Sequence, residues 1–261
     1  MKESELLMAS LISGSGTTME ATIKAYQEGK LGGVRPVVVI ASRPEAPGLQ
    51  KAKNLGVETK VVGPGDFATA EAFGEKLLQT LNEYQVDLLS QNGWLPQTPE
   101  NVVKAYQGMA FNQHPGPLDP GRSKLDFGGK GMYGSRVTCT RVAFEWVVGE
   151  KHPWTEATTH YVTENYDEGD LIRVVRLEIP LLGQPVTVAE LRENPQTLVR
   201  TTKEVQKELL PLEHENVIAT LQAFAESNQR GFRRNQPLVA SGQEKILFQA
   251  KKLAKELFPE G

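Results

Sequence analysis

The chain has 261 residues, of which 39% are hydrophobic and 23% charged, a composition typical of globular proteins. Its 29 basic and 32 acidic residues give a formal net charge of -3, which disfavours a dedicated nucleic-acid-binding protein, because such binding depends on neutralising phosphates. The single cysteine, Cys139, excludes an intramolecular disulfide and a multi-cysteine metal site. The apolar run near the N-terminus is too short to span a membrane and lacks a signal-peptide pattern. We therefore expect a cytoplasmic protein that is not inserted in a membrane.

The first half of the sequence alternates between strand and helix patterns. Apolar runs predict strands at 6–12, 37–41, 58–62, 86–91 and 109–114. Between them, helical spacing predicts helices at 18–28, 49–56, 67–84 and 98–106, the last with Thr98 as its N-cap and Pro99 in its first turn. This alternation favours an α/β fold with a parallel sheet covered by helices on both faces.

The second half is less regular. A Gly-rich loop at 121–131 precedes an apolar helix at about 134–149, and two strand-like runs at 155–164 and 170–180 predict an antiparallel hairpin. Helical patterns follow at 196–227 and 242–258, separated by the basic turn QRGFRRNQP. We expect a catalytic domain at 1–227 and a C-terminal extension at 228–261. The glycines of loop 121–131 suggest a gate that closes over substrate.

The segment SGSGTTMEATI, residues 13–23, joins the first predicted strand to the first helix. Small residues at such a junction let the backbone approach a ligand, and the N–H groups at a helix start favour an anion. The segment has neither the third glycine of the dinucleotide fingerprint nor the Gly-Lys-Ser/Thr of a P-loop. Taken alone it is compatible with a tight turn, but ligands of α/β sheets bind at the carboxyl ends of strands.

The segment FNQHPGP ends the fifth predicted strand. Residues two apart in an extended chain face the same side, so Asn112 and His114 can converge on one point. Pro115 restricts His114 towards the extended region. An amide and an imidazole together are suited to holding an oxyanion, although a lone histidine in a turn is more often packed or solvated.

The acidic turn NYDEGD, residues 165–170, is the third candidate segment. Its carboxylates do not fit a calcium loop, so Asp167 is either part of a solvated turn or a base that orients and charges a nearby histidine. We expect core positions for Cys139 and structural roles for His160 and His214.

The order of these three segments along the chain resembles that of the folate-dependent formyltransferase family. The resemblance runs from about Leu11 to about Glu226 and is carried by LISGSGTTMEATI, DLLSQNGWLPQTPENVVKAY, FNQHPGPL, GMYG, THYVTENYDEGDLI and LLPLEHENV. It implies a Rossmann-like three-layer formyltransferase fold with a mostly parallel sheet, here followed by a C-terminal helical extension. It also implies 10-formyltetrahydrofolate as co-substrate, with no metal.

The resemblance assigns roles to thirteen residues. Asn112, His114 and Asp167 match the catalytic trio of the family. The residues that match its phosphate-binding loop are Gly14, Ser15, Gly16, Thr17 and Thr18, and those that match its folate-pocket segment are Gly93, Trp94, Leu95, Pro96 and Gln97. Thr18 replaces a usual asparagine, and Pro96 replaces a usual polar residue.

The resemblance predicts transfer of a formyl group to the primary amine of a small phosphorylated substrate, with glycinamide ribonucleotide as the first candidate. Two alternatives stay open: formylation of another amine, either an amino sugar nucleotide or an aminoacyl-tRNA, and a non-catalytic folate- or nucleotide-binding protein. The expected partners are the amine substrate and folate, without a membrane and without nucleic acid, in a monomer or homodimer.

Overall fold

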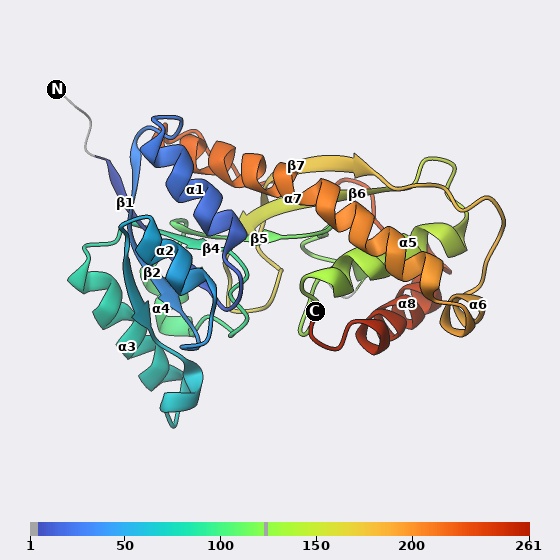
Figure 1. Ribbon diagram of the computed structural model, residues 1–261, viewed down its shortest axis with the longest axis horizontal. Helices are drawn as coiled ribbons and strands as arrows, with labels where there is room; N and C mark the ends of the chain where they lie inside the picture. The colour runs from blue at the N-terminus through green and yellow to red at the C-terminus, as the bar shows by residue number, and fades with distance from the viewer. Residues whose placement is uncertain (1–4, 123–124) are drawn as a thin grey trace.

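The computed structural model describes residues 5–122 and 125–261, and its centre is a seven-stranded sheet (Figure 1). The strands are β1 (Leu6–Ile12), β2 (Val34–Ala41), β3 (Glu58–Val61), β4 (Leu88–Gln91), β5 (Ala110–His114), β6 (Trp154–Tyr161) and β7 (Leu171–Glu178). Their order is β3-β2-β1-β4-β5-β6-β7; β1 to β5 run parallel, and β6 and β7 are antiparallel to their neighbours. The predicted parallel sheet and the hairpin are both confirmed.

The helices that follow the strands are also close to the predicted ranges. They are α1 (Thr17–Gln27), α2 (Gly48–Asn54), α3 (Ala70–Glu83), α4 (Glu100–Ala105), α5 (Ser135–Val148), α6 (Val188–Glu193), α7 (Gln196–Ala225) and α8 (Glu244–Leu257), together with a short 3-10 turn η1 (Pro64–Asp66). The sequence analysis missed α6, a helix of six residues that begins with a capping box between Thr187 and Glu190.

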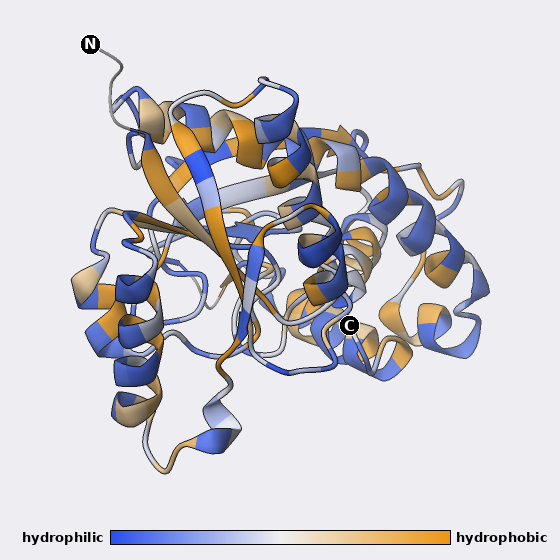
Figure 2. Cartoon of the chain, turned by 60° about the vertical axis from the view of Figure 1, so that its left-hand side comes forward, coloured by the Kyte–Doolittle hydropathy of each residue, from blue (hydrophilic) through white to orange (hydrophobic). Residues whose placement is uncertain are grey.

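Helices cover both faces of the sheet, as the alternating pattern predicts. On one face α3 and α4 contribute Phe73, Leu77, Leu81 and Val102 to a core with Leu11, Ile40 and Leu89. On the other face α1, α2 and the C-terminal half of α7 pack on the sheet through Ile23, Leu49, Val217 and Leu221. The strands are mainly apolar and the outward sides of the helices hydrophilic, as Figure 2 shows. This three-layer arrangement is the predicted fold class.

The C-terminal residues pack closely against the rest of the chain. The buried residues Leu247, Ala250 and Leu253 of α8 share a core with Val142 and Trp146 of α5. Figure 1 shows α8 alongside α5, with α7 running from α1 across to α6. The boundary at 227 stays a prediction, but residues 244–257 are part of a continuous hydrophobic core.

One predicted cap is wrong. Pro99, and not Thr98, is the N-cap residue of α4, and the cap has no side-chain hydrogen bond. The Thr98 hydroxyl instead accepts a hydrogen bond from Nε2 of Gln91, 2.7 Å away, because Gln91 at the end of β4 is buried and needs a partner. The predicted gate at 121–131 includes residues 123 and 124, which lie outside the described residues.

Candidate active site

A cavity of about 1030 Å³ opens at the carboxyl ends of β1, β4 and β5. The strand order reverses between β1 and β4, which is where open α/β sheets bind their ligands. The turns after these two strands are joined, since the N–H of Ser13 donates to the carbonyl of Gly93 and the N–H of Leu95 donates to Oγ of Ser13. All thirteen residues that the sequence analysis singled out line this cavity.

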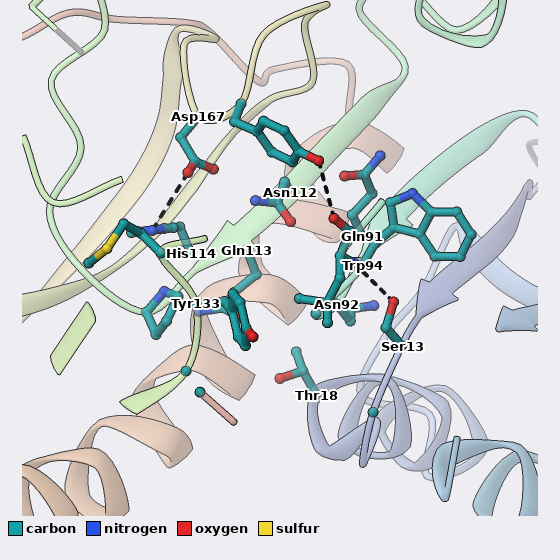
Figure 3. A pocket seen from close by; sticks show the side chains of 18 of the residues that line it. Ser13, Thr18, Gln91, Asn92, Trp94, Asn112, Gln113, His114, Tyr133 and Asp167 are labelled. Atoms are coloured by element: carbon teal, nitrogen blue, oxygen red, sulfur yellow. Dashed lines mark hydrogen bonds and ion pairs between the residues drawn. The ribbon is translucent and has the colours of Figure 1, made fainter. Parts of the chain in front are cut away.

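The turn between β1 and α1 forms one end of the cavity. Gly16 is the N-cap of α1 and has a φ of 62°, in the left-handed region that favours glycine. A side chain there would also meet the backbone of Gly48, with 3.2 Å between a Cβ and the Gly48 Cα. The N–H groups at the start of α1 are not capped by a side chain, and they are available to an anion. Thr18, in the first turn, is 6% exposed and lines the cavity (Figure 3).

The segment 93–97 forms a second wall. Trp94 is buried and stacks on Phe73 with 6.3 Å between the ring centroids, which fixes the segment to α3. The Tyr166 hydroxyl donates to the carbonyl of Leu95 at 3.3 Å, and Nε2 of Gln97 donates to the carbonyl of Glu164 at 2.6 Å. These two bonds tie the wall to the turn that carries Asp167.

Asn112 and His114 belong to β5 and both line the cavity, as their spacing predicts (Figure 3). Nδ1 of His114 donates to the carbonyl of Gly116 at 3.1 Å, because a carbonyl can only accept. In the neutral ring Nε2 is therefore unprotonated, and it is buried without a partner among the described residues. Nε2 can thus take a proton, and in the charged ring it becomes a donor.

Asp167 lies in the turn between β6 and β7 and has a φ of 60°, which is unusual for a residue with a side chain. Its carboxylate lies between two imidazoles: Oδ2 is 3.8 Å from Nε2 of His114, and Oδ1 is 3.5 Å from Nε2 of His160. Oδ2 also accepts the N–H of Gly129 at 2.8 Å. The strained turn is therefore held by interactions of the carboxylate.

His114 and Asp167 shift the pKa of one another. Burial lowers the pKa of His114, and the Asp167 carboxylate opposes that decrease. Burial raises the pKa of Asp167, but His114, His160 and the Gly129 N–H together outweigh it and hold the pKa below its usual range. Asp167 is therefore an anion at neutral pH, and it supports a positive charge on the ring beside it.

His160 needs a correction, because we expected it to be structural. It pairs with Asn112 across β5 and β6 and lines the cavity. Nδ1 of His160 donates to the carbonyl of Tyr161 at 2.9 Å, and Nε2 lies 3.0 Å from Nδ2 of Asn112. In its neutral form the ring can therefore accept from the Asn112 amide and orient it. The alternation of His160 with Thr158 in a buried strand gave no hint of this, because the partner lies on a different strand.

The sequence analysis assigned no role to three other residues that line the cavity. Glu213 of α7 is buried, and burial raises its pKa to about 8. Arg43, after β2, donates from Nε to the carbonyl of Ser13 at 2.7 Å and so supports the first turn. Tyr166 precedes Asp167 and contacts Leu95. A helical glutamate and a loop arginine are common on protein surfaces, and only the fold brings them to the cavity.

Comparison with known proteins identifies the class. The family model "Formyl transferase" matches residues 7–122, which include the first turn, the 93–97 wall, Asn112 and His114. Residues 7–122 therefore form a formyl transferase domain.

Relatives and solved structures narrow this further. The chain is 25% identical over 244 residues to the chloroplastic phosphoribosylglycinamide formyltransferase of Vigna unguiculata, covering 90% of this chain and 65% of that protein. It is 30% identical over 178 residues to the trifunctional purine biosynthetic protein adenosine-3 of Drosophila melanogaster, covering 67% of this chain and 12% of that protein. The crystal structure of glycinamide ribonucleotide transformylase 1 from Symbiobacterium toebii superposes with a TM-score of 0.65 at 26% identity, covering 85% of this chain and 89% of that one.

The chain thus spans 65% of the first of these curated relatives and a much smaller part of the second. Among the described residues, no helix is long and apolar enough to cross a membrane. Within residues 5–122 and 125–261, no group of three or more His, Cys, Asp or Glu side chains could hold a metal ion.

Proposed function

We propose that the chain transfers the formyl group of 10-formyltetrahydrofolate to the primary amine of glycinamide ribonucleotide. The observation that carries the proposal is the convergence of Asn112, His114 and Asp167 on one cavity that extends to the turn before α1. An amide donor, an imidazole with a free Nε2 and a buried carboxylate are the groups that acyl transfer to an amine requires. The names of the similar proteins supply the acceptor.

The reaction would use these groups as follows. The substrate amine attacks the formyl carbon, a C–N bond forms, and the formyl oxygen becomes an oxyanion. The Asn112 amide and the protonated Nε2 of His114 donate hydrogen bonds to that oxygen, each worth roughly 3–4 kcal/mol in the barrier. The intermediate then collapses, the bond to N10 of the folate breaks, and N10 leaves with a proton. The products are the formylated amine and tetrahydrofolate.

Asp167 and His160 would support this step. The Asp167 anion, with Oδ2 3.8 Å from Nε2 of His114, stabilises the positive charge on that ring and can accept, through a water molecule, the proton that the attacking amine loses. His160 orients the Asn112 amide through its Nε2.

The rest of the cavity suits the two substrates. The Gly14–Thr18 turn and the start of α1 would bind the phosphate, and Glu213 lies on the same cavity with a carboxyl group that can bind sugar hydroxyls. The 93–97 wall would hold the pterin of the folate, since flat heterocycles bind between backbone polar groups and apolar side chains. Trp94 Nε1, buried without a partner among the described residues, is a further donor in this wall.

The test is a direct assay. Purified protein is incubated with 10-formyltetrahydrofolate and glycinamide ribonucleotide, and tetrahydrofolate release and the formylated product are both measured. We expect turnover that is abolished in His114→Ala. Turnover with an amino sugar nucleotide or an aminoacyl-tRNA, but not with glycinamide ribonucleotide, would overturn the acceptor. Tight folate binding with no formylation of any amine would favour a binding protein instead.

A further inference from the structure

The C-terminal helix α8 is connected to Asp167 by two hydrogen bonds, which are made to the two sides of a single peptide group. Nζ of Lys251 donates to the carbonyl of Gly128 at 2.9 Å, and the N–H of Gly129 donates to Oδ2 of Asp167 at 2.8 Å. These carbonyl and N–H groups belong to the same peptide. The peptide is therefore held at one end by an ammonium and at the other by a carboxylate. A cation on the carbonyl makes the N–H a stronger donor, since hydrogen bonds in series polarise one another.

The chain before this peptide is also fixed. A side chain at Gly128 would lie 2.5 Å from Cδ2 of Leu118 and 2.9 Å from Cβ of Asp167, so only glycine allows this approach. Asp126 is fully buried and accepts the N–H of Gly128 at 3.1 Å and that of Asp119 at 3.0 Å. Asp126 thereby joins the loop to the segment that follows His114. Two neighbouring glycines can flip their shared peptide easily, and nothing in their own conformation selects one orientation.

Three titratable side chains act on the pKa of His114: Asp167 on the β6–β7 turn, His160 on β6 and Lys251 on α8. Asp126, in the loop, acts on Asp167 and Lys251. Burial lowers the pKa of Lys251, and the nearby Asp126 and Asp167 oppose that decrease. Lys251 in turn acts to lower the pKa of His114. A cation at this position thus favours ionised Asp167 and a less basic His114.

We propose that Lys251 is a positioning residue for the formyl transfer: it orients and polarises the Gly128–Gly129 peptide that holds the Asp167 carboxylate. The proposal rests on the function proposed above. Lys251 is in the C-terminal extension for which the family resemblance gave no counterpart. The C-terminal extension then contributes to the active site, because its helix supplies the ammonium group that holds the Gly128–Gly129 peptide.

The kinetic test compares two variants of the same helix. Lys251→Met removes the ammonium and keeps an unbranched apolar side chain, and Lys252→Met is the matched control, because Lys252 is exposed on α8. We expect kcat of Lys251→Met to fall roughly tenfold to a hundredfold, since misplacing a catalytic group by about 1 Å has such an effect. The KM values for both substrates should stay within about twofold, because Lys251 touches neither phosphate loop nor folate wall. Lys251→Arg should recover most of the loss.

A second measurement does not depend on turnover. Amide hydrogen exchange reports the Gly129 N–H directly, and we expect it to exchange about tenfold faster in Lys251→Met than in wild type and Lys252→Met, because the peptide is no longer held. The His114 ring, titrated by NMR, should show a higher pKa in Lys251→Met. Unchanged Gly129 exchange would overturn the proposal even if the protein proves not to be a formyltransferase. A loss of kcat in Lys251→Met that Lys252→Met shares would overturn it too.

Discussion

Oδ2 of Asp167 lies 3.8 Å from Nε2 of His114, and both side chains are buried. This distance is longer than a hydrogen bond, yet each group shifts the pKa of the other. Catalytic hydrogen bonds in unliganded sites are often long and tighten when substrate binds. In the unliganded protein the two side chains therefore interact through their charges and not through a direct hydrogen bond.

Asp167→Asn tests this coupling. The substitution keeps the shape of the side chain and removes the charge, so we expect kcat to fall by roughly 10² to 10⁴, as for other carboxylates that support a catalytic histidine. Because the carboxylate acts to raise the pKa of His114, the limb of the pH–activity profile that reports His114 should move to lower pH. Steady-state kinetics between pH 5 and pH 9 measure both effects. If that limb stays at the same pH, Asp167 does not influence the pKa of His114.

Gly16→Ala tests the turn before α1. Its left-handed φ and the closeness of Gly48 mean that a methyl group must displace the backbone. We expect KM for the phosphorylated amine to rise about tenfold while KM for the folate is unchanged, since binding one phosphate correctly is worth on the order of 1–3 kcal/mol. Gly32→Ala is the control, because a Cβ there has nothing within 4 Å and Gly32 is not among the residues that line the cavity. An equal rise in both KM values would argue against a phosphate site.

The basic turn allows a paired stability test. Arg234 donates to the carbonyl of Leu118 and pairs with Glu156, which is fully buried, whereas Arg233 pairs with Asp170 at the surface. Arg234→Met leaves a buried carboxylate unpaired, so the free energy of unfolding should fall by about 3–5 kcal/mol. Arg233→Met should cost about 1 kcal/mol or less, because exposed ion pairs contribute little. Urea unfolding of the two variants measures the difference, and equal losses would contradict this interpretation of the turn.

Glu213 gives a prediction about pH. Burial raises its pKa in the folded protein to about 8, above the ordinary value of 4.5. An acid with a raised pKa destabilises the folded state progressively as pH rises from the ordinary value through the folded value. Glu213→Gln should therefore increase the Tm of the ligand-free protein at pH 8 and change it little at pH 5. Glu208→Gln, at an exposed position of the same helix, should show no such pH dependence. Measuring the Tm of both variants by thermal unfolding at pH 5 and pH 8 tests this prediction.

Much of the fold could be predicted from local patterns. β1, β2, β4 and β5 contain short runs of buried residues that are mostly apolar, and the helices between the strands have one apolar face, so periodicity located both. The edge strand β3 is mostly exposed. Boundaries were less accurate, as the early start of β2 at Val34 illustrates. Helix α6 was missed because six residues carry too little periodic signal, and the Thr98 cap was wrong because a buried Gln91 competes for its hydroxyl.

The candidate site, too, could be predicted only in part from the sequence. By itself the sequence determined which residue types stand after which strands: the glycines before α1, Asn112 and His114 two apart on β5, and Asp167 in a turn. These depend on neighbours along the chain, because strand alternation and proline act locally. Only the tertiary structure decided that His160, Glu213 and Lys251 belong with them. Their partners lie far away in sequence, and a residue's burial and charge environment exist only once the sheet, α7 and α8 have packed together.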